Sequence, residues 1–248
     1  MLVTPIIVIP ARIGSTRLPG KALAAIAGKP MIAHVLERGL EAGIGPVAVA
    51  TDSPEIAAAV ETAGGRAVMT FETHACGLDR IGEALRAVDP GRRHDVVVDL
   101  QGDQPFLPQG ALQAAVELLQ DPAVDMATLA TEAAVGEEDD PDTPKLVGSE
   151  ISPRRLRALY FTRARAPWGE GVFYHHIGVY AFRRPAFERF VALPPSALEK
   201  RERLEQLRAL EAGMRIDAAL LDRAGPSVDT ETDLEAARRT APGKQDRR

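Results

Sequence analysis

The sequence contains very little cysteine. Cys76 is the one cysteine among 248 residues, so the chain cannot form a disulfide bond within itself. A lack of paired cysteines is typical of proteins in a reducing compartment. The length is that of one large domain or of a domain with an appendage, and the 45% of apolar residues is ordinary for a globular protein.

Long apolar runs are also missing. No run approaches the ~20 residues that a membrane-spanning helix needs. The apolar segment near the N-terminus is too short for a signal peptide and lacks a basic flank and a cleavage site. We therefore expect no membrane span and no signal peptide, and we predict a cytoplasmic protein.

Acidic residues are absent from the first part of the chain. No Asp or Glu precedes Glu37, whereas Arg12, Arg17, Lys21 and Lys29 all do. The formal net charge of the whole chain is −5, which argues against bulk binding to nucleic acid or to anionic membranes. A local excess of positive charge in an acidic protein predicts a bound anion there, and chance clustering on a solvated face is the alternative.

The basic segment only partly resembles a P-loop. Residues 9–23 read IPARIGSTRLPGKAL. A P-loop has four residues between its first glycine and its Gly-Lys pair, and Ser or Thr follows the lysine. Here five residues separate Gly14 from Gly20, and Ala22 follows Lys21. The spacing therefore argues against an ordinary P-loop NTPase. The segment nevertheless has the glycines and cations that hold phosphates.

Strands and helices are expected to alternate over the first 120 residues. The apolar run 6–9 predicts a buried strand, and further strands are predicted at 47–50, 66–69 and 95–100. A helix is predicted from residue 30, with Met31, Ile32, Val35, Leu36 and Leu40 on one face, and another at 79–88. Ser53 is predicted to cap a helix that has Pro54 at its first position. This alternation predicts an α/β fold with a mainly parallel sheet covered by helices on both faces.

The second half of the chain is less regular. Residues 131–144 are acidic and predict a surface loop, and 172–182 and 216–221 predict strands. Ser196 and Glu199 form a capping-box pattern that predicts a helix to about Leu210, and Thr230–Asp233 predicts the start of a last helix. We expect one domain over residues 1–240 with an inserted lobe near 131–215, followed by a disordered tail at 241–248.

Two polar segments follow predicted strands of the parallel sheet. The basic segment follows strand 6–9, and Gln101-Gly102-Asp103 follows strand 95–100. Ligands of such sheets bind beyond the carboxyl ends of the strands, so both segments are predicted to meet at one edge. Glycines allow backbone N–H groups to approach a triphosphate, and arginine and lysine supply the counter-charge. A divalent cation held by carboxylates is expected beside such a ligand, and Asp103 is a candidate.

These residues carry a resemblance to a known family. The run P-A-R-x-x-S-T-R-L-P-G-K after a first strand resembles the sugar-activating cytidylyltransferases. It is most similar to the 3-deoxy-D-manno-octulosonate (Kdo) cytidylyltransferase family. Further matches occur at Gly28–Ile32, Ala50–Asp52, Gln101–Asp103 with Pro105, Leu159–Ala164, His176–Tyr180, Leu204–Arg208 and Val228–Thr230, so the resemblance covers roughly residues 3–240.

The resemblance implies a fold and a reaction. The fold is a three-layer nucleotide-sugar-transferase (Rossmann-like) domain with a mixed sheet, and the assembly is a homodimer. The reaction joins CTP and Kdo, with Mg²⁺, to give CMP-Kdo and pyrophosphate for lipopolysaccharide assembly. The nucleophile is the anomeric hydroxyl of the sugar, so no catalytic Ser-His-Asp set is expected.

The resemblance also implies roles for individual residues. The predicted catalytic residues are Arg12, Lys21, Asp103 and Asp229, and the two aspartates would bind Mg²⁺. The predicted nucleotide-binding residues are Pro10, Ala11, Arg12, Ser15, Arg17, Lys21, Cys76, Gly77, Arg80 and Gln101. The predicted sugar-binding residues are Arg163, His176, Tyr180, Glu205 and Gln206.

Several of these assignments have a structural alternative. Arg12 and Arg17 would then lie on the surface without a role, Asp103 would be a turn residue, and Asp229 would merely neighbour a helix cap. His176 would be a hydrogen-bonded core histidine. Glu205 and Gln206 would lie on the solvated face of a helix, and Asp99 is as well explained as a structural acceptor as it is as a further carboxylate.

The sequence departs from the family pattern H-x-S-G-T-[DE]-R in the nucleotide-base segment. Cys76 stands in place of the serine and Leu78 in place of the threonine, so two hydroxyl groups are missing. Gln104 replaces the usual Glu after Asp103. A hydrogen bond is worth roughly 0.5–1.5 kcal/mol, so the preference for cytosine over uracil could be loosened without being lost. Two alternatives follow: a cytidylyltransferase for a related ulosonic acid (an 8-amino Kdo analogue or a sialic acid), and a nucleotide-binding protein with weak catalysis.

Overall fold

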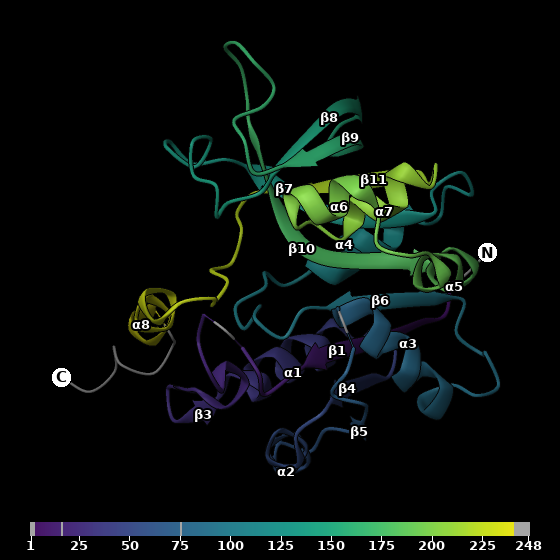
Figure 1. Cartoon of the computed structure of the whole chain (residues 1–248), viewed down its shortest axis with the longest axis vertical. Helices are drawn as coiled ribbons and strands as arrows, with labels where there is room; N and C mark the ends of the chain where they lie inside the picture. The colour runs from purple at the N-terminus through teal and green to yellow at the C-terminus, as the bar shows by residue number, and fades with distance from the viewer. Residues whose placement is uncertain (1–2, 16, 75, 241–248) are drawn as a thin grey trace. The chain divides into compact units, whose positions relative to one another are not determined.

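The computed structural model describes residues 3–15, 17–74 and 76–240. The chain divides into two compact units (Figure 1). Unit 1 contains Met1–Pro5, His94–Val98 and Gly110–Ala224, and unit 2 contains Ile6–Arg93, Asp99–Gln109 and Gly225–Arg248. The single domain with an inserted lobe near 131–215 stays a prediction. The tail at 241–248 lies outside the described residues.

Unit 2 is built on a parallel sheet. Its strands stand in the order β5 (Ala67–Met69), β4 (Val47–Thr51) and β1 (Pro5–Ala11). The last two residues of β6 (Val96–Leu100), Asp99 and Leu100, also belong to this unit. β1 pairs with β4, and β4 with β5, in parallel. Every residue of β1 is buried, and Ile6–Ile9 are at most 2% exposed, which confirms the central strand predicted from the apolar run.

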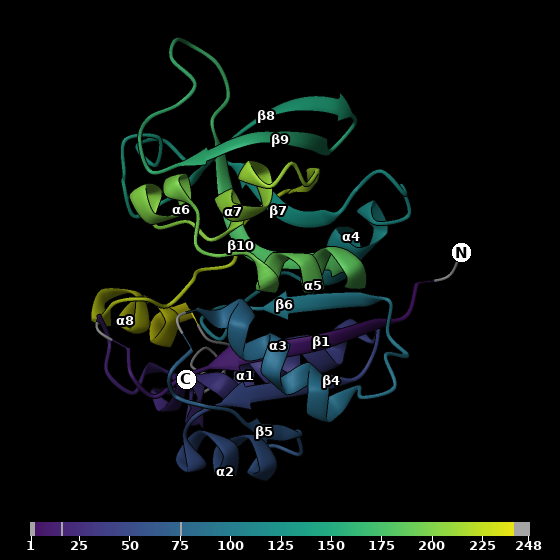
Figure 2. The same ribbon diagram turned by 45° about the vertical axis from the view of Figure 1, so that its right-hand side comes forward.

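Helices connect the strands of unit 2. These are α1 (Met31–Ala42), α2 (Pro54–Thr62) and α3 (Gly77–Val88), and the last helix, α8 (Glu231–Thr240), also belongs to this unit. α1 and α2 contact each other and β4, while α3 leads from β5 back across the sheet to β6. With right-handed crossovers this reversal places α3 on the face opposite α1, as Figure 2 shows. The doubly wound arrangement confirms the predicted fold class.

Local signals explain where several of these elements begin. The Ser53 hydroxyl accepts a hydrogen bond from Ile56 N at 3.2 Å, and Pro54 is the first residue of α2, which confirms the predicted cap. The basic segment continues through a short 3-10 helix, η1 (Lys21–Leu23), and the small hairpin β2 (Ala25–Ile26) and β3 (Lys29–Pro30). One detail of α1 was wrong: Leu40 is 50% exposed, because Gly39 takes the buried position against Val47 in that turn.

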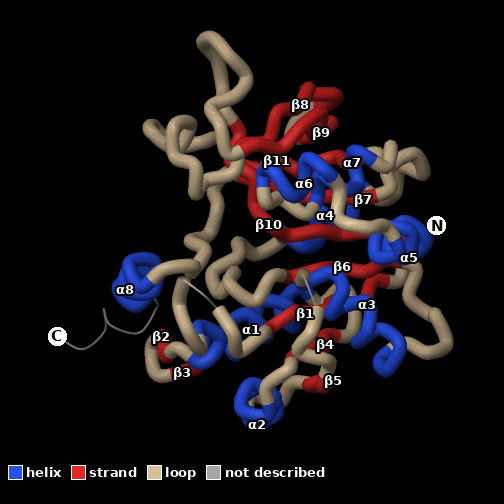
Figure 3. The backbone as a smooth tube through the Cα atoms, in the orientation of Figure 1, coloured by secondary structure: helices blue, strands red, loops and turns tan. Residues whose placement is uncertain are grey.

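Unit 1 carries a sheet of mixed direction, and its strands are red in Figure 3. Its strands stand in the order β10 (Tyr174–Arg183), β7 (Met126–Glu132), β11 (Ile216–Leu221), β9 (Arg155–Thr162) and β8 (Lys145–Ser152). β7 and β11 run parallel, whereas β10 with β7, β11 with β9 and β8 with β9 are antiparallel. The predicted strands at 172–182 and 216–221 are confirmed, and the acidic stretch lies between β7 and β8 as a mostly exposed loop.

The described residues of unit 1 form four short helices. They are α4 (Ala111–Leu118), α5 (Arg184–Ala192), α6 (Ala197–Glu202) and α7 (Gln206–Glu211). The capping box at Ser196 and Glu199 is present. The prediction of one helix to about Leu210 was wrong, because Arg203 adopts φ 57°, which is left-handed and ends α6. α7 then starts separately after the buried Leu204. Among the described residues, no helix is long and apolar enough to cross a membrane.

Candidate active site

The basic segment forms a closed loop after β1. Ile13 O accepts hydrogen bonds from Ser15 N at 3.1 Å and from Gly20 N at 3.3 Å, and Ser15 Oγ accepts one from Leu18 N at 3.3 Å. Gly20 has φ 67°, a left-handed conformation that costs glycine little and that lets the chain turn into η1. The loop thus ends on Lys21, the first residue of η1. We call residues 12–21 the phosphate loop.

The lysine of this loop joins two distant aspartates. Lys21 Nζ donates to Asp103 Oδ2 at 2.9 Å and to Asp229 Oδ1 at 3.0 Å. Arg17 Nη2 lies 2.9 Å from the same Asp229 oxygen. Asp103 follows β6 and Asp229 precedes α8, so the ends of three segments meet here. This confirms the prediction that the phosphate loop and Gln101-Gly102-Asp103 lie at one edge of the sheet.

The ion pairs affect the protonation of the lysine. Burial alone would lower the pKa of Lys21, because it disfavours the charged ammonium, but the neighbouring Asp103 and Asp229 carboxylates outweigh it. The net result is a raised pKa for Lys21. The side chain is therefore a permanent cation at neutral pH, partly shielded from water at 19% exposure.

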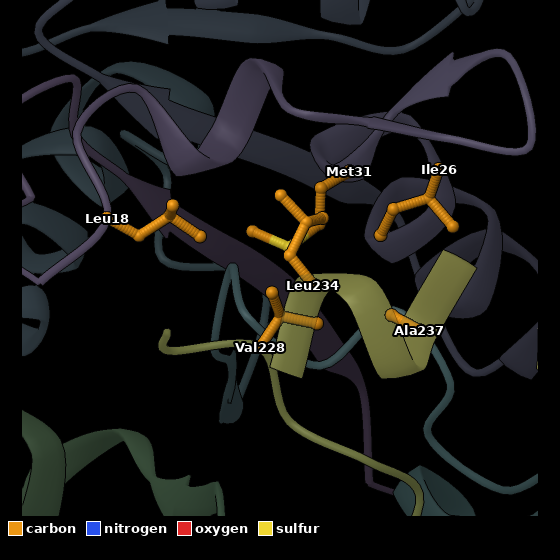
Figure 4. Close-up of a cluster of buried hydrophobic side chains, with 6 residues drawn as sticks. All are labelled: Leu18, Ile26, Met31, Val228, Leu234 and Ala237. Carbon is orange, nitrogen blue, oxygen red and sulfur yellow. The ribbon is translucent and has the colours of Figure 1, made fainter. Parts of the chain in front are cut away.

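A small hydrophobic cluster brings Asp229 to the loop (Figure 4). Val228 and Leu234 at the start of the C-terminal segment pack with Leu18 of the phosphate loop and with Ile26 and Met31. Val228 is fully buried, and its N–H donates to Asp103 O at 3.0 Å. The backbone on one side of Asp229 is therefore fixed to the residue that carries the other carboxylate.

The backbone on the other side of Asp229 is fixed by a helix cap. Asp233 Oδ2 accepts hydrogen bonds from Asp229 N at 3.1 Å, from Thr230 N at 2.8 Å and from Thr230 Oγ1 at 2.9 Å. Thr230 Oγ1 in turn accepts from Asp233 N at 3.2 Å. The predicted cap of the last helix is thus confirmed, and Asp229 is both a neighbour of this cap and a partner of Lys21.

Several residues predicted to bind the nucleotide also gather in unit 2. A Cβ placed on Gly77 would lie 3.2 Å from Pro10 Cγ and 3.4 Å from Gln101 Nε2, so these three residues are neighbours. Gly102 lies so close to the end of β1 that a Cβ there would be 2.8 Å from Pro10 O, which only glycine tolerates. Gln101 Nε2 donates to Asp99 Oδ2 at 2.7 Å, in line with the structural alternative for Asp99.

Arg12, Arg80 and Cys76 differ in their surroundings. Arg12 is exposed at the start of the phosphate loop, open to a ligand. Arg80 is 3% exposed, and its guanidinium already binds Asp52 and Thr70. Cys76 is the half-buried N-cap residue of α3. The roles of these residues in nucleotide binding stay predictions.

Three of the predicted sugar-binding residues form one buried network in unit 1. Tyr180 OH donates to Gln206 Oε1 at 2.9 Å, and Gln206 Nε2 lies 3.4 Å from His176 Nδ1. His176 Nε2 lies 2.9 Å from the hydroxyl of Thr128. Gln206 is 1% exposed, so the alternative that places it on a solvated helix face is wrong. Both ring nitrogens of His176 have partners, as expected for a hydrogen-bonded core histidine, and its contact with sugar stays a prediction.

The network keeps its histidine neutral. Burial, the larger cause, and the neighbouring His175 together lower the pKa of His176 to about 3. The ring stands edge-on to Phe161, with the ring centroids 4.8 Å apart. An apolar wall of this kind disfavours the imidazolium. His176 is thus a neutral hydrogen-bonding group at physiological pH.

Arg163 and Glu205, the other two predicted sugar-binding residues, have different surroundings. Arg163 donates from N to Glu202 Oε2 and from Nε to Glu202 O, both at 3.0 Å, and from Nη1 to Pro141 O at 2.8 Å. Glu205 is half-buried at the start of α7. Their roles in sugar binding stay predictions.

The sequence interpretation missed several residues that organise the site. Asp52, Thr128, Glu202 and Asp233 each hold a predicted site residue or its backbone in place. Asp52 lies in the quoted Ala50–Asp52 match and Asp233 in the predicted cap, so a signal existed for both. Thr128 and Glu202 stand in no pattern that singles them out.

The two aspartates beside Lys21 fit a magnesium ion. Magnesium is usually bound by one or two carboxylates together with water and substrate phosphates, and not by a cage of protein ligands. Asp103 and Asp229 place carboxylate oxygens within reach of one cation, as their shared contact with Lys21 Nζ shows. Among the described residues, no group of three or more His, Cys, Asp or Glu side chains is placed to hold a metal. The donor set thus suits a metal that arrives with a nucleotide.

Comparisons with known proteins agree with this geometry. The sequence model of a family described as cytidylyltransferase matches residues 6–216. A 3-deoxy-manno-octulosonate cytidylyltransferase of Methylobacterium nodulans is 60% identical over 94% of this chain and 95% of the relative, and one of Rhodopseudomonas palustris is also 60% identical over the same shares. A solved CMP:2-keto-3-deoxy-manno-octonic acid synthetase complexed with CTP superposes with a TM-score of 0.86 at 40% identity, covering 95% of this chain and 97% of that one. An apo-UDP-glucose pyrophosphorylase, at 16% identity and a TM-score of 0.68, shares the fold.

Proposed function

Because this chain belongs to the cytidylyltransferase family, we propose that it transfers CMP from CTP to the anomeric hydroxyl of Kdo and releases pyrophosphate. One observation carries the proposal above all. Relatives with this named activity are 60% identical to the chain over 94% of its length, and they are covered almost completely themselves. The resemblance of the solved CTP complex at 40% identity points to the same nucleotide.

The site chemistry supports a nucleotidyl transfer. In the proposed reaction the anomeric oxygen bonds to the α-phosphorus, the hydroxyl loses its proton, and the bond from the α-phosphorus to the bridging oxygen breaks. Arg12, Arg17 and Lys21 would neutralise the charge on the triphosphate and on the departing pyrophosphate. Asp103 and Asp229 would hold Mg²⁺, which supplies further stabilisation of phosphate charge. Each of these side chains belongs to unit 2.

The remaining assignments extend the same proposal. Pro10, Ala11, Ser15, Cys76, Gly77, Arg80 and Gln101 would line the nucleotide site. Arg163 would bind the Kdo carboxylate, and His176, Tyr180, Glu205 and Gln206 would face its hydroxyl groups. We also propose a homodimer, a cytoplasmic location and a supply of CMP-Kdo to lipopolysaccharide assembly.

A second candidate function keeps the chemistry and changes the substrate. The acceptor would then be a related ulosonic acid, such as an 8-amino Kdo analogue or a sialic acid. Weak catalysis by a nucleotide-binding homologue is the other alternative. The substitutions at Cys76, Leu78 and Gln104 relative to the family pattern motivate this last alternative, since each changes a polar group beside the proposed nucleotide or metal.

Pyrophosphate release tests the proposed function. Purified protein is incubated with Mg²⁺, Kdo and each of CTP, UTP, ATP and GTP in turn. We expect release with CTP well above that with the other three nucleotides. Comparable release with UTP would locate a change in the base site, whereas no release with any nucleotide would contradict the proposal.

A second series separates the candidate sugars. The same assay is run with CTP and with Kdo, its 8-amino analogue or a sialic acid, each without and with EDTA. The proposal predicts the highest kcat/KM for Kdo and a loss of activity when EDTA removes the metal. A higher kcat/KM for another acid sugar would favour the second candidate function.

A further inference from the structure

A buried ion pair lies behind the proposed nucleotide site. Arg80 Nη2 lies 2.8 Å from Asp52 Oδ2, and the two side chains are only 3% and 8% exposed. Arg80 Nη1 also donates to Thr70 Oγ1 at 2.5 Å. Asp52 follows β4, Thr70 follows β5, and Arg80 stands in the first turn of α3. The guanidinium therefore joins α3 to the ends of two strands.

The second oxygen of Asp52 reaches the phosphate loop. Asp52 Oδ1 accepts a hydrogen bond from Ile13 N at 3.1 Å. Ile13 is the residue whose carbonyl accepts from both Ser15 N and Gly20 N, so its position sets the closure of the loop. One carboxylate thus binds the phosphate loop through one oxygen and α3 through the other.

The start of α3 also lies close to the end of β1, from which the phosphate loop continues. Gly77, the first residue of α3, is a neighbour of Pro10 and of Gln101. In the proposed function, the phosphate loop binds the triphosphate and the segment 74–80 lies beside the base or ribose. The ion pair therefore stands between the two parts of the chain that would bind the two ends of one nucleotide.

We propose that Asp52 and Arg80 are positioning residues that fix the phosphate loop relative to the start of α3, and that they let one CTP molecule bind to both at once. The inference rests on the proposed function, because CTP is the ligand with these two ends. In this account Arg80 acts on the phosphate loop through Asp52 and Ile13, and this positioning is additional to its proposed place in the lining of the nucleotide site.

The physical basis is the gain from joining two binding events. When one end of a ligand is bound, the other end meets its own site at a high effective concentration, provided that the two sites are held at the right separation. A charged pair with both partners buried holds its geometry firmly, because breaking it leaves a charge without compensation. Loss of the pair should therefore weaken binding of the whole nucleotide more than binding of either half.

A neutral double variant tests this without leaving a buried charge. The variant Asp52→Asn/Arg80→Met keeps similar side-chain volumes, and the Asn oxygen can still accept from Ile13 N. Arg80→Lys is a partial rescue, since lysine keeps the charge beside Asp52 but lacks the fork that reaches Asp52 and Thr70 together. The matched control is Arg38→Met/Glu41→Gln, which removes an exposed ion pair on α1 in the same unit. Circular dichroism and thermal unfolding establish that each variant is folded.

Calorimetry then measures the Kd of CTP, CMP and pyrophosphate for each folded protein, with Mg²⁺ present throughout. We expect the double variant to raise the Kd of CTP by about tenfold while the Kd values of CMP and pyrophosphate change by less than about twofold. Arg80→Lys should lie between the double variant and the wild type, and the control should match the wild type.

Two results would overturn the inference. One is an equal increase in the Kd of CTP, CMP and pyrophosphate, which would give the ion pair a merely structural role. The other is an unchanged Kd of CTP in a folded double variant. Wild-type protein that binds neither CTP nor pyrophosphate would contradict the proposed function as well. Wild-type binding of CTP together with either of the first two results would contradict this inference alone.

Discussion

Lys21 Nζ lies 3.0 Å from Asp229 Oδ1, although 208 positions separate the two residues in the chain. The same ammonium binds Asp103 at 2.9 Å. The cation proposed to hold phosphate and the carboxylates proposed to hold metal are thus paired with each other in this structure. When a metal–nucleotide complex binds, Lys21 would exchange the two carboxylates for phosphate, and Asp103 and Asp229 would exchange Lys21 for the metal. Each charge would therefore have a partner of opposite sign both before and after binding.

This pairing predicts a competition between Lys21 and a divalent cation. Replacing Lys21 with Met keeps most of the length of the side chain and removes its charge, which leaves Asp103 and Asp229 without their common partner. We expect the variant to bind Mn²⁺ more tightly than the wild type in the absence of nucleotide, as measured by electron paramagnetic resonance. The same variant should lose about 10²–10³-fold in kcat, the usual effect of removing a preorganised electrostatic group.

Lys29→Met is the control for this experiment. Lys29 belongs to the same basic stretch but is 54% exposed and pairs with Glu37. It should leave both the Mn²⁺ affinity and kcat close to the wild-type values. An unchanged Mn²⁺ affinity in Lys21→Met would contradict the competition.

A second prediction concerns the cap beside Asp229. Asp233→Ala removes the acceptor that binds the backbone of Asp229 and Thr230 and should cost about 0.5–2 kcal/mol of unfolding free energy. Because Asp229 is then held from one side only, we expect a lower kcat in a protein that remains folded. Urea unfolding and steady-state kinetics measure the two effects, with Glu235→Ala of the same helix as the control. Equal kcat values for the two variants would show that the cap does not position Asp229.

His176 gives a prediction about acid stability. The native pKa is about 3, whereas an unfolded histidine titrates near 6.5. Between these pH values the unfolded chain binds a proton that the native protein does not bind. The stability that neutral His176 contributes is therefore complete above about pH 6.5 and is lost as the pH falls, at about 1.4 kcal/mol per pH unit.

Urea unfolding at several pH values between 6.5 and 4.5 tests this sign. The variant His176→Gln can still form hydrogen bonds to Thr128 and Gln206 but has no group that titrates in this range. On acidification its unfolding free energy should fall by about 1.4 kcal/mol per pH unit less than that of the wild type. Nuclear magnetic resonance should show no titration of the His176 ring between pH 8 and 5. A midpoint near pH 6.5 for this ring would contradict the account.

A fourth prediction concerns a buried charge network in unit 1. Asp217 is fully buried and accepts hydrogen bonds from Arg155 Nε at 2.8 Å and Arg215 Nε at 2.9 Å. Asp217→Ala removes the buried partner of two guanidinium groups, which keep their pairs with Asp121 and are 22% and 23% exposed. The substitution should therefore destabilise the protein by about 1–3 kcal/mol. Asp222→Ala breaks the exposed pair with Arg154 and should leave the unfolding free energy unchanged within error. Equal effects of the two substitutions in urea unfolding would contradict the prediction.

The local elements of the first half could be predicted from the sequence because their signals are local. The run at residues 6–9 is apolar throughout because β1 is buried on both faces. The Ser53 cap was recognisable because its donor, Ile56 N, lies three residues away. The meeting of the phosphate loop with Gln101-Gly102-Asp103 could also be predicted, because ligands of parallel sheets bind beyond the carboxyl ends of the strands.

Elements that depend on distant partners could not be predicted in this way. β8 contains Gly148 and alternates weakly, and it is held by its pairing with β9 and β10. The helix from Ser196 ends at Glu202 because the backbone of Arg203 is left-handed. Arginine rarely adopts this conformation, so the residue type does not predict it. The buried network of His176, Gln206 and Tyr180 joins β10 to α7, and spacing alone does not reveal it.

The pairing of Asp229 with the phosphate loop shows the same limit. Physical signals marked the loop as an anion site and Asp103 as a carboxylate at a strand end. Asp229 stood out only through the family resemblance and its place before a helix cap. The hydrophobic contacts of Val228 and Leu234 that bring it to Lys21 are long-range, and an ordinary apolar pattern does not specify their partners.

Direct detection of the product tests the central claim most directly. CTP, Kdo and Mg²⁺ are mixed with wild-type protein, Asp229→Asn or Glu231→Gln, and ³¹P nuclear magnetic resonance follows the reaction. Glu231 is two residues from Asp229 but is 63% exposed and pairs with Arg238, so it is a close control. The account predicts that the wild type and Glu231→Gln each form a CMP–sugar phosphodiester and pyrophosphate in equal amounts and at similar rates. It predicts a rate about 10²–10³-fold lower for Asp229→Asn. Formation of no phosphodiester by the wild type, or full activity of Asp229→Asn, would contradict it.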